Sequence, residues 1–194
     1  MCVLARRYCD LMYRTTNSVA EQKALLARSL ACSLQAVAVD PSNATAHACV
    51  AVCYAKDCAF EDLKAKLNDT RVFKLEAERT ITLDPKQDVA YYLLGRWNYG
   101  VANVGFLSRA YVRLVYGGLP AASNEAAITN FQKAIELAPE KIMHHAALAD
   151  VYETTGQTDK EIAELKKCRE LKSTGLEDND AQRDALKKLA ALGQ

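Results

Sequence analysis

Arg109 and Arg113 are the residues of this sequence whose type and spacing best suit a binding site. They stand four positions apart, so on a helix their side chains point to the same side. Tyr111 and Tyr116 belong to the same segment. Two guanidinium groups beside phenol rings suit a phosphate group or a carboxylate-rich peptide tail. The alternative is that both arginines pair with acidic side chains on neighbouring helices, which gives them a structural role.

A second group of candidate binding residues comes from the helical phase of two other segments. Tyr92, Arg96 and Tyr99 share a face of one predicted helix, and the acidic residues Asp150 and Glu153 lie on another. An aromatic and arginine cluster next to an acidic pair suits an extended peptide or an anionic headgroup. The alternative is that residues 105–120 cover this face, so that its tyrosines pack against that segment and its arginine pairs with the first acidic residue. The group consists of Tyr92, Arg96, Tyr99, Asp150 and Glu153.

Residues typical of enzyme active sites are scarce. Of the three histidines, His47, His144 and His145, the first and last fall on positions used for packing between repeated helices, which favours a place in the core. The sequence has no glycine-rich phosphate loop, no nucleophile elbow and no histidine pair at metal-binding spacing. We therefore expect no enzyme, no cofactor and no metal site.

The seven cysteines raise the question of a metal or disulfide site. No pair has the C-x-x-C spacing of zinc and redox motifs, and no secretory signal accompanies them. We expect reduced cysteines that act as small apolar core residues, with no disulfide in reducing medium. The alternative is a metal bound by Cys49 and Cys53 on one helical face, but no close second pair completes such a site.

Composition and charge argue against several classes of protein. A net charge of +1 gives no general attraction to nucleic acid, so we expect no nucleic-acid partner. Apolar runs are short and interrupted by charges, so we expect no transmembrane segment. With 194 residues the chain is long enough to bury a core, and we expect a single domain over 1–194.

Three prolines punctuate the chain in a repeated pattern. Pro41, Pro85 and Pro139 each follow the end of an amphipathic helix, and strand-type alternation is absent. The two ends of the stretch 84–139 resemble the halves of a tetratricopeptide repeat (TPR), a helix pair of about 34 residues. An extra segment at about 105–120 lies between the halves. The predicted fold class is all-α, a TPR-like α–α superhelix of about four helix pairs plus a C-terminal capping helix.

Cap residues mark the ends of the predicted helices. Asn17 or Ser18 caps the second helix, with Glu21 placed as in a capping box. Residues 178–192 have the composition of a capping helix, which repeat arrays need to close an open core. The helix pairs are predicted at 2–14 with 18–39, at 43–58 with 61–83, from about 86 with a helix that is capped at 123–125 and stops before Pro139, and at 140–155 with 158–172.

Glycines in two places predict close backbone geometry. Gly95 lies inside a helix, where glycine costs about 1 kcal/mol relative to alanine, so we expect a neighbouring helix to approach closely there. Gly117 and Gly118 permit a tight return after a short helix in 105–120. This extra segment is too apolar to be disordered, so we expect it to fold over the groove next to Arg96 and to carry the binding specificity.

Several motifs together resemble the regulator of microtubule dynamics family. The resemblance covers about residues 20–172 and is densest from 84 to 152. It implies a non-enzymatic, cytoplasmic protein; animal members associate with microtubules and spindle poles, and a mitochondrial branch tethers organelles and binds phospholipid through its TPR domain. The motifs are Tyr-Leu-Leu-Gly-Arg-Trp at 92–97, Val-Ala-Asn at 101–103, Leu-Ser-Arg at 107–109, Tyr-Gly-Gly-Leu-Pro at 116–120 and Ala-Ser-Asn-Glu-Ala-Ala at 122–127.

Two functions follow as expectations. The first is a non-catalytic interaction protein that binds protein partners through their acidic tails or peptides, with tubulin as the candidate that the resemblance implies. The alternative is a lipid-binding or lipid-transfer module at membrane contact sites, with phospholipid as its ligand. The expected location is cytoplasmic, on microtubules or at the mitochondrial surface.

Overall fold

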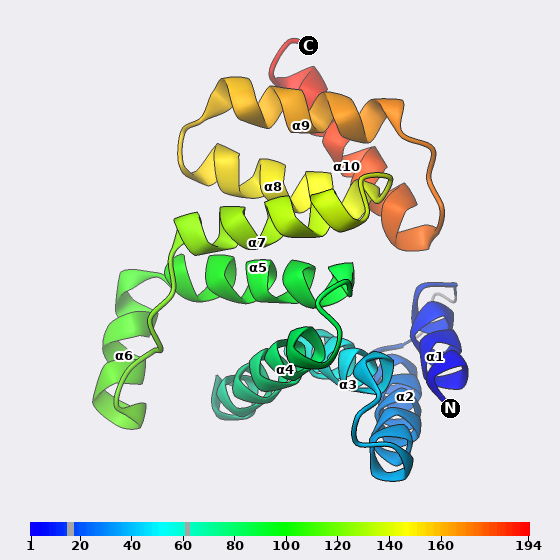
Figure 1. Cartoon of the computed structure of the whole chain (residues 1–194). Coiled ribbons are helices and arrows are strands. Elements are labelled where there is room, and N and C mark those ends of the chain that lie inside the picture. The colour runs from blue at the N-terminus through cyan, green and yellow to red at the C-terminus, as the bar shows by residue number, and fades with distance from the viewer. Residues whose placement is uncertain (15–17, 61–62) are drawn as a thin grey trace. The chain divides into compact units, whose positions relative to one another are not determined.

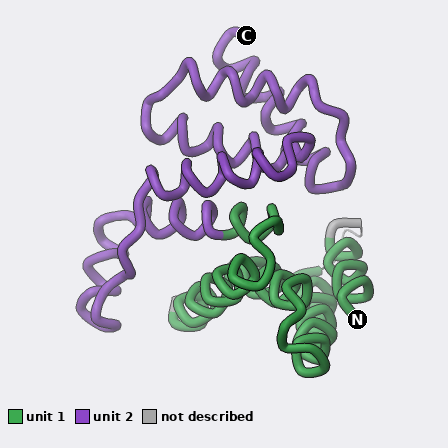
Figure 2. Tube along the Cα trace, viewed as in Figure 1, with its two compact units in different colours: residues 1–93 green, residues 94–194 purple. Residues whose placement is uncertain are grey.

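The computed structural model describes residues 1–14, 18–60 and 63–194, and within them every regular element is an α-helix (Figure 1). Ten helices and no strand occur in these ranges, as the periodicity predicted. None of the described helices is long and apolar enough to cross a membrane. The chain divides into two compact units, residues 1–93 and 94–194, which Figure 2 colours separately.

The first unit contains four helices and the start of a fifth. Successive helices from the first to the fourth pack on one another, and the first also contacts the third. One core cluster joins Cys9, Met12, Leu26 and Cys53, which come from the first three helices. The helices are α1 (Cys2–Arg14), α2 (Val19–Val39), α3 (Ala44–Asp57), α4 (Leu63–Leu83) and α5 (Asp88–Ala102), and the boundary between the units falls within α5.

The N-terminus of α2 shows how local sequence sets a helix end. The Ser18 side chain accepts a hydrogen bond from the Glu21 backbone N–H, and Glu21 Oε2 accepts one from the Ser18 N–H at 2.9 Å. This reciprocal capping box satisfies N–H groups that a helix start leaves open, and it confirms the predicted cap. Asn17, the other predicted cap, lies outside the described residues.

The second unit continues α5 and adds five helices. α7 packs on α8, α8 packs on α9, and α10 contacts both α8 and α9. Its core cluster includes Ile142, Leu165 and Leu189 from α8, α9 and α10, so the last helix closes the apolar side of the preceding pair. The added helices are α6 (Phe106–Tyr116), α7 (Asn124–Leu137), α8 (Ile142–Thr154), α9 (Thr158–Glu170) and α10 (Leu176–Ala191).

Helices α5 and α7 approach closely at a glycine. A Cβ atom added to Gly95 would lie 2.6 Å from two ring carbons of Phe131, closer than Cβ atoms come in real proteins. Phe131 is fully buried, so its ring cannot move aside without disturbing the surrounding core. The predicted reason for a glycine inside this helix is thereby confirmed.

A buried histidine joins the two helices of a pair to the turn before them. In the second unit His145 Nδ1 lies 2.7 Å from Glu164 Oε2, and Nε2 lies 2.9 Å from the Pro139 carbonyl oxygen. Burial disfavours charge on the ring, but the hydrogen bonds to Glu164 and Pro139 outweigh it and raise the pKa of His145. A carbonyl oxygen only accepts, so Nε2 donates. The same joint in the first unit consists of His47, Glu76 and Pro41, with distances of 2.6 Å and 3.0 Å.

Candidate functional site

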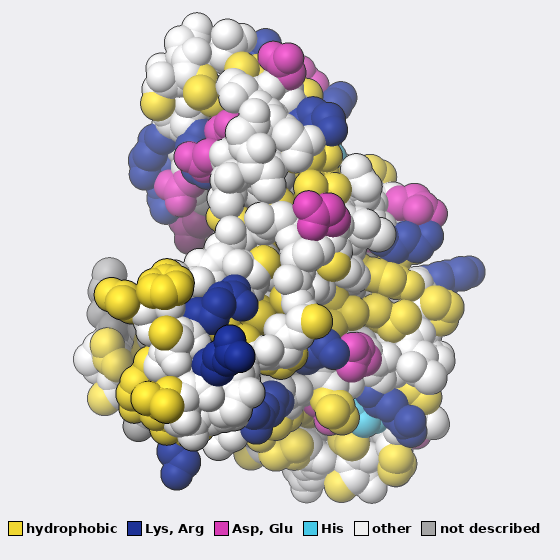
Figure 3. Space-filling model, turned by 90° about the vertical axis from the view of Figure 1, so that its left-hand side faces the viewer, with side chains coloured by type: hydrophobic (Ala, Val, Ile, Leu, Met, Phe, Trp, Pro, Cys, Tyr) yellow, Lys and Arg dark blue, Asp and Glu magenta, His cyan; other side chains and the backbone are white. Residues whose placement is uncertain are grey.

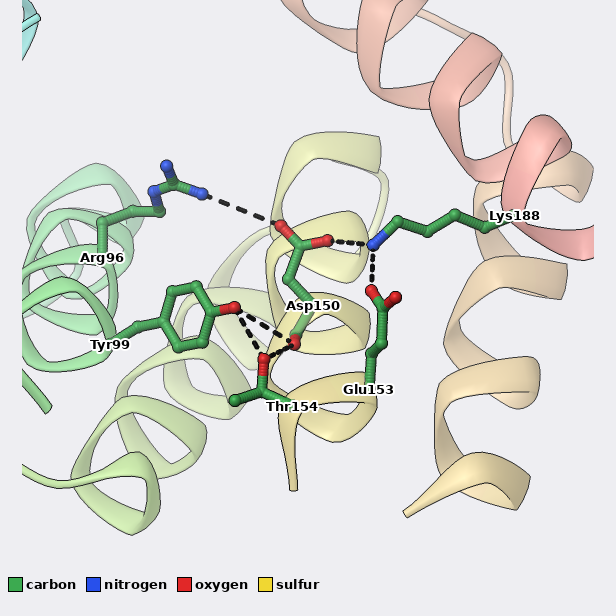
Figure 4. Close-up of polar contacts among 6 residues, drawn as sticks. All are labelled: Arg96, Tyr99, Asp150, Glu153, Thr154 and Lys188. Atoms are coloured by element: carbon green, nitrogen blue, oxygen red, sulfur yellow. Dashed lines mark hydrogen bonds and ion pairs between the residues drawn. The ribbon is translucent and has the colours of Figure 1, made fainter. Parts of the chain in front are cut away.

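The predicted acidic pair on α8 is bound by a lysine from α10. Lys188 Nζ donates a hydrogen bond to Asp150 Oδ1 at 2.7 Å and another to Glu153 Oε2 (Figure 4). Partial burial disfavours the ammonium charge, but the hydrogen bonds and the charges of the two carboxylates outweigh it and raise the pKa of Lys188. The acidic pair therefore already has a basic partner within the second unit.

A third carboxyl group belongs to the same electrostatic cluster. Glu161, in the first turn of α9, is only 5% exposed. Burial raises its pKa, the charges of Glu153 and Asp150 raise it further, and Lys188 opposes them. Lys188 thus interacts electrostatically with the carboxyl groups of Asp150, Glu153 and Glu161. Within the described part of the chain, no three His, Cys, Asp or Glu side chains are arranged to hold a metal ion.

Arg96 and Tyr99 of α5 approach this cluster from another side (Figure 4). Arg96 Nη1 lies 3.8 Å from Asp150 Oδ2, too far for a good hydrogen bond, and 49% of its side chain is exposed. Tyr99 Oη lies 2.8 Å from Thr154 Oγ1 and 3.5 Å from the Asp150 carbonyl oxygen. Tyr99 therefore joins α5 to α8, whereas Arg96 keeps N–H donors available to a ligand.

Arg109 attaches the inserted helix to the end of α5. Its Nη2 donates hydrogen bonds to the carbonyl oxygens of Val101 at 2.9 Å and Ala102 at 3.1 Å. Carbonyls at the end of a helix lack partners within it and carry the negative end of its dipole, so a guanidinium group stabilises them. Arg109 thus has a structural role, through backbone carbonyls rather than through the acidic side chains considered in the sequence.

Arg113 is the other arginine of the inserted helix, and it is exposed. No acidic side chain among the described residues pairs with it. Because Arg109 is bound to the end of α5, the two guanidinium groups are not equally available. Of the predicted pair, Arg113 is the one whose guanidinium group makes no hydrogen bond or ion pair with the residues that the structure describes.

Helix α6 presents an apolar face to solvent. Phe106, Leu107 and Leu114 are 82%, 81% and 86% exposed, and Val112 is the buried residue of this helix. Figure 3 looks at the side of the molecule on which α6 lies in Figure 1, and hydrophobic side chains gather there beside Lys and Arg side chains. Phe106 and Leu107 are too exposed to cover Tyr92 and Tyr99, as the alternative interpretation of this segment has it. The pairing of Arg96 with Asp150, which belongs to the same alternative, is present at 3.8 Å.

The position of α6 differs from the sequence-based expectation for a physical reason. The segment was expected to fold over the groove next to Arg96, but the hydrogen bonds from Arg109 hold α6 at the C-terminal end of α5. At its other end α6 stops at Gly117 and Gly118, whose φ values of 80° and 111° favour glycine. The return toward α7 is thus the tight one that the sequence predicted.

The segment around α6 carries only positive charge. Residues 89–124 contain three arginines and no Asp, Glu or Lys. The rings of Tyr111 and Tyr116 meet edge to face, with centroids 6.4 Å apart, and Tyr111 is half exposed. Exposed apolar and aromatic side chains therefore combine with Arg113 on a helix without acidic residues.

The structure brings most of the predicted residues together, along with two that the sequence analysis missed. Tyr92 is half-buried in α5 at the end of the first unit. The sequence hinted at the position of Lys188, because this residue directly precedes Leu189 in the apolar stripe of α10. It gave no such hint for Thr154. The residues in contact around Asp150 are Arg96, Tyr99, Glu153, Thr154 and Lys188.

Comparison with known proteins finds a family match over nearly the whole chain. The family model described as regulator of microtubule dynamics protein 1-3 matches residues 1–193. Regulator of microtubule dynamics protein 2 from Mus musculus is 28% identical over 190 residues, which is 97% of this chain and 46% of the relative. Protein 3 from Xenopus laevis is 28% identical, covering 92% of this chain and 38% of the relative. The chain thus spans less than half the length of these curated relatives.

Solved structures show a similar fold in TPR proteins. The thermophilic TPR protein TTC0263 from Thermus thermophilus superposes with a TM-score of 0.64 at 16% identity, covering 96% of this chain and 79% of that one. MamA superposes with a TM-score of 0.52 at 18% identity, covering 92% of this chain and 99% of that one. At such identities the likeness shows a TPR-like fold and nothing further.

Proposed function

This chain belongs to the regulator of microtubule dynamics family, and from that membership we propose that it is a non-catalytic interaction protein that binds an acidic protein segment through α6. The proposal applies to the part of the protein represented by this chain. TPR-like scaffolds present helices as binding surfaces, and functional specificity is added by local segments such as α6.

The apolar face of α6 is the observation that carries this proposal. Phe106, Leu107 and Leu114 are each more than four-fifths exposed, although burying such a side chain is worth roughly 1.5–3 kcal/mol. Large apolar side chains gathered on one exposed helix are typical of interaction sites. A partner that covers them removes this apolar surface from water, as the core of an interface does.

Charge complementarity identifies the chemistry of the partner. The absence of acidic residues from 89–124, together with exposed Arg96 and Arg113, favours a ligand rich in Asp and Glu. Relatives named for microtubule dynamics make the acidic tails of tubulin the first candidate. A cytoplasmic location on microtubules follows from this proposal.

Phospholipid is a second candidate ligand, and the same helix supports it. An amphipathic helix with exposed Phe and Leu side chains and Arg instead of Asp or Glu suits the interface of an anionic membrane. Lipid binding or transfer at membrane contact sites, including the mitochondrial surface, is the function that this second ligand implies.

Binding measurements on one set of variants separate the two candidates. Serine replaces Phe106, Leu107 and Leu114 together, and Leu75→Ser is the control, because Leu75 is 65% exposed on α4. The ligands are a glutamate-rich peptide containing Leu and Phe, the same peptide with Gln for Glu, and phosphatidylcholine vesicles with or without phosphatidic acid.

The proposal predicts that the wild-type chain and Leu75→Ser bind the acidic peptide and that the triple variant does not. The Gln peptide should bind more weakly, since it lacks the charges that Arg96 and Arg113 attract. Binding to the acidic vesicles instead of the peptide supports the lipid function. Equal binding by wild type and triple variant excludes α6 as the site.

A further inference from the structure

Four cysteines lie in two pairs across the contact between α1 and α3 in the first unit. On α1 they are spaced by seven residues and on α3 by four, so each helix presents two of them on one face. The two helices contact each other directly. The pairs are Cys2 with Cys49 and Cys9 with Cys53.

The inner pair is held together by a buried serine. The Sγ atoms of Cys9 and Cys53 each lie 3.2 Å from Ser29 Oγ, so the two thiols lie on the same buried hydroxyl group. Ser29 donates its only hydroxyl proton to the Ala5 carbonyl oxygen at 2.8 Å. Its oxygen therefore accepts from the two S–H groups, so both cysteines are neutral thiols.

The outer pair is more open than the inner one. Cys2 and Cys49 are half-buried, whereas Cys9 is 8% and Cys53 1% exposed. Burial raises the pKa of Cys49 to about 11, and the neighbouring Cys9 thiol together with burial raises the pKa of Cys53. Because a thiolate is the attacking species in disulfide exchange, these raised pKa values slow the reaction of both pairs with an oxidant.

We propose that the α1–α3 contact is a thiol-oxidation site, at which a small-molecule disulfide such as oxidised glutathione converts facing cysteines into a disulfide that joins α1 to α3. Neither the family membership nor the proposed binding through α6 depends on this site. The cysteine arrangement differs from a C-x-x-C motif because the partners come from separate helices, which sequence spacing does not reveal.

The reaction balances with one equivalent of oxidant. A thiolate of the pair, formed by loss of one proton, attacks a sulfur of oxidised glutathione, forms a mixed disulfide and releases one glutathione thiolate. The facing cysteine loses its proton, attacks the mixed disulfide and releases the second glutathione thiolate. Both released thiolates take up a proton. The protein thus loses two hydrogens, and the oxidant is reduced to two glutathione molecules.

The outer pair is the entry point for oxidation. Cys2 and Cys49 are more accessible than the inner pair, so their disulfide forms first, and the inner disulfide forms more slowly because oxidised glutathione must reach two buried thiols. A cross-link between α1 and α3 closes a long loop and restricts the unfolded chain, so the oxidised protein is the more stable form.

The test is oxidation of the folded chain with oxidised glutathione, followed by non-reducing proteolysis and mass spectrometry. The variants are C2S/C49S, C9S/C53S and the matched control C32S/C58S, which removes two half-buried cysteines outside the pairs. Wild type and control should yield a peptide that links α1 to α3, and their Tm should rise by several degrees and fall again on reduction.

The variants show which pair reacts. C2S/C49S should lose the outer cross-link and require longer oxidation for the inner one, a result that does not depend on whether C9S/C53S folds. A cross-link in either pair of the folded wild type supports the proposal. Glutathione adducts on single cysteines without any α1–α3 peptide, or cross-links that form only in denaturant, overturn it.

Discussion

At Gly95 a missing side chain decides how closely two helices approach. Glycine costs a helix about 1 kcal/mol relative to alanine, and here it leaves room for the ring of Phe131. The sequence indicated this role because a glycine within an amphipathic pattern needs a packing reason. The identity of the neighbour, Phe131 on α7, came only from the structure, because the inserted α6 separates the two helices in the chain.

Substitution of Gly95 by alanine should destabilise the second unit. The added Cβ overlaps a buried ring, and such overpacking typically costs roughly 1–3 kcal/mol. Gly100→Ala is the matched control on the same helix, since nothing lies within 4 Å of a Cβ there, and it should gain up to about 1 kcal/mol. Urea unfolding that finds the two variants equally stable contradicts this account of Gly95.

His145 predicts a pH dependence of stability. Its pKa is raised in the folded protein above the unfolded value of about 6.5. The joint to Glu164 and Pro139 therefore contributes fully below that unfolded pKa, and the contribution is lost as pH rises through the folded pKa. The free energy of unfolding should fall as the pH rises above the unfolded pKa of about 6.5, and His145→Gln should make this fall smaller. If the free energy of unfolding depends on pH in the same way in wild type and variant, the protonated His145 does not stabilise the fold through Glu164 and Pro139.

Side-chain roles that depend on distant contacts were the hardest to predict. Arg109 and Arg113 have the same type and share a helix, yet one binds backbone carbonyls of α5 and the other is exposed. Their spacing predicts a shared side of α6 but does not say which of them reaches another helix. Lys188 was missed for the same reason, because its carboxylate partners lie on α8.

Among the elements, helix positions were predicted well and the placement of α6 was not. Prolines, caps and apolar periodicity are local signals, and the observed helix boundaries lie within two residues of the predicted ones; the predicted start at 61 lies outside the described residues. The direction of α6 depends on the surface that the helix contacts. The eleven residues of α6 alone do not determine that surface. Its high exposed fraction is consistent with a helix whose apolar face serves a partner.

Substitutions of the two arginines of α6 should have different effects. Arg113→Ala should weaken binding of the acidic peptide by roughly 1–3 kcal/mol, with a salt-dependent loss, because a charge-assisted contact is removed. Arg109→Ala should chiefly speed amide hydrogen exchange in α6, because the bonds to Val101 and Ala102 are lost. Equal effects of both substitutions on exchange and on affinity contradict the division of roles.

At the scale of the whole molecule, the chain divides into two compact units, and α6 of the second unit has large exposed apolar side chains. Family membership connects it with regulators of microtubule dynamics, and the TPR-like fold is shared with proteins of low sequence identity. The central claim is that α6 makes this scaffold a receptor for an acidic protein segment. Tubulin tails are the acidic partner that we propose.

Co-sedimentation with microtubules tests that claim most directly. The wild-type chain, the Leu75→Ser control and the variant with serine at 106, 107 and 114 are compared on microtubules with intact tails and on microtubules from which the acidic tails have been cleaved. We predict that wild type and control pellet with intact microtubules, and that both tail cleavage and the triple substitution abolish pelleting, increasingly so at higher salt. The account is contradicted if the wild type does not pellet with intact microtubules. It is also contradicted if the wild type pellets equally after tail cleavage and the triple variant pellets as the wild type does.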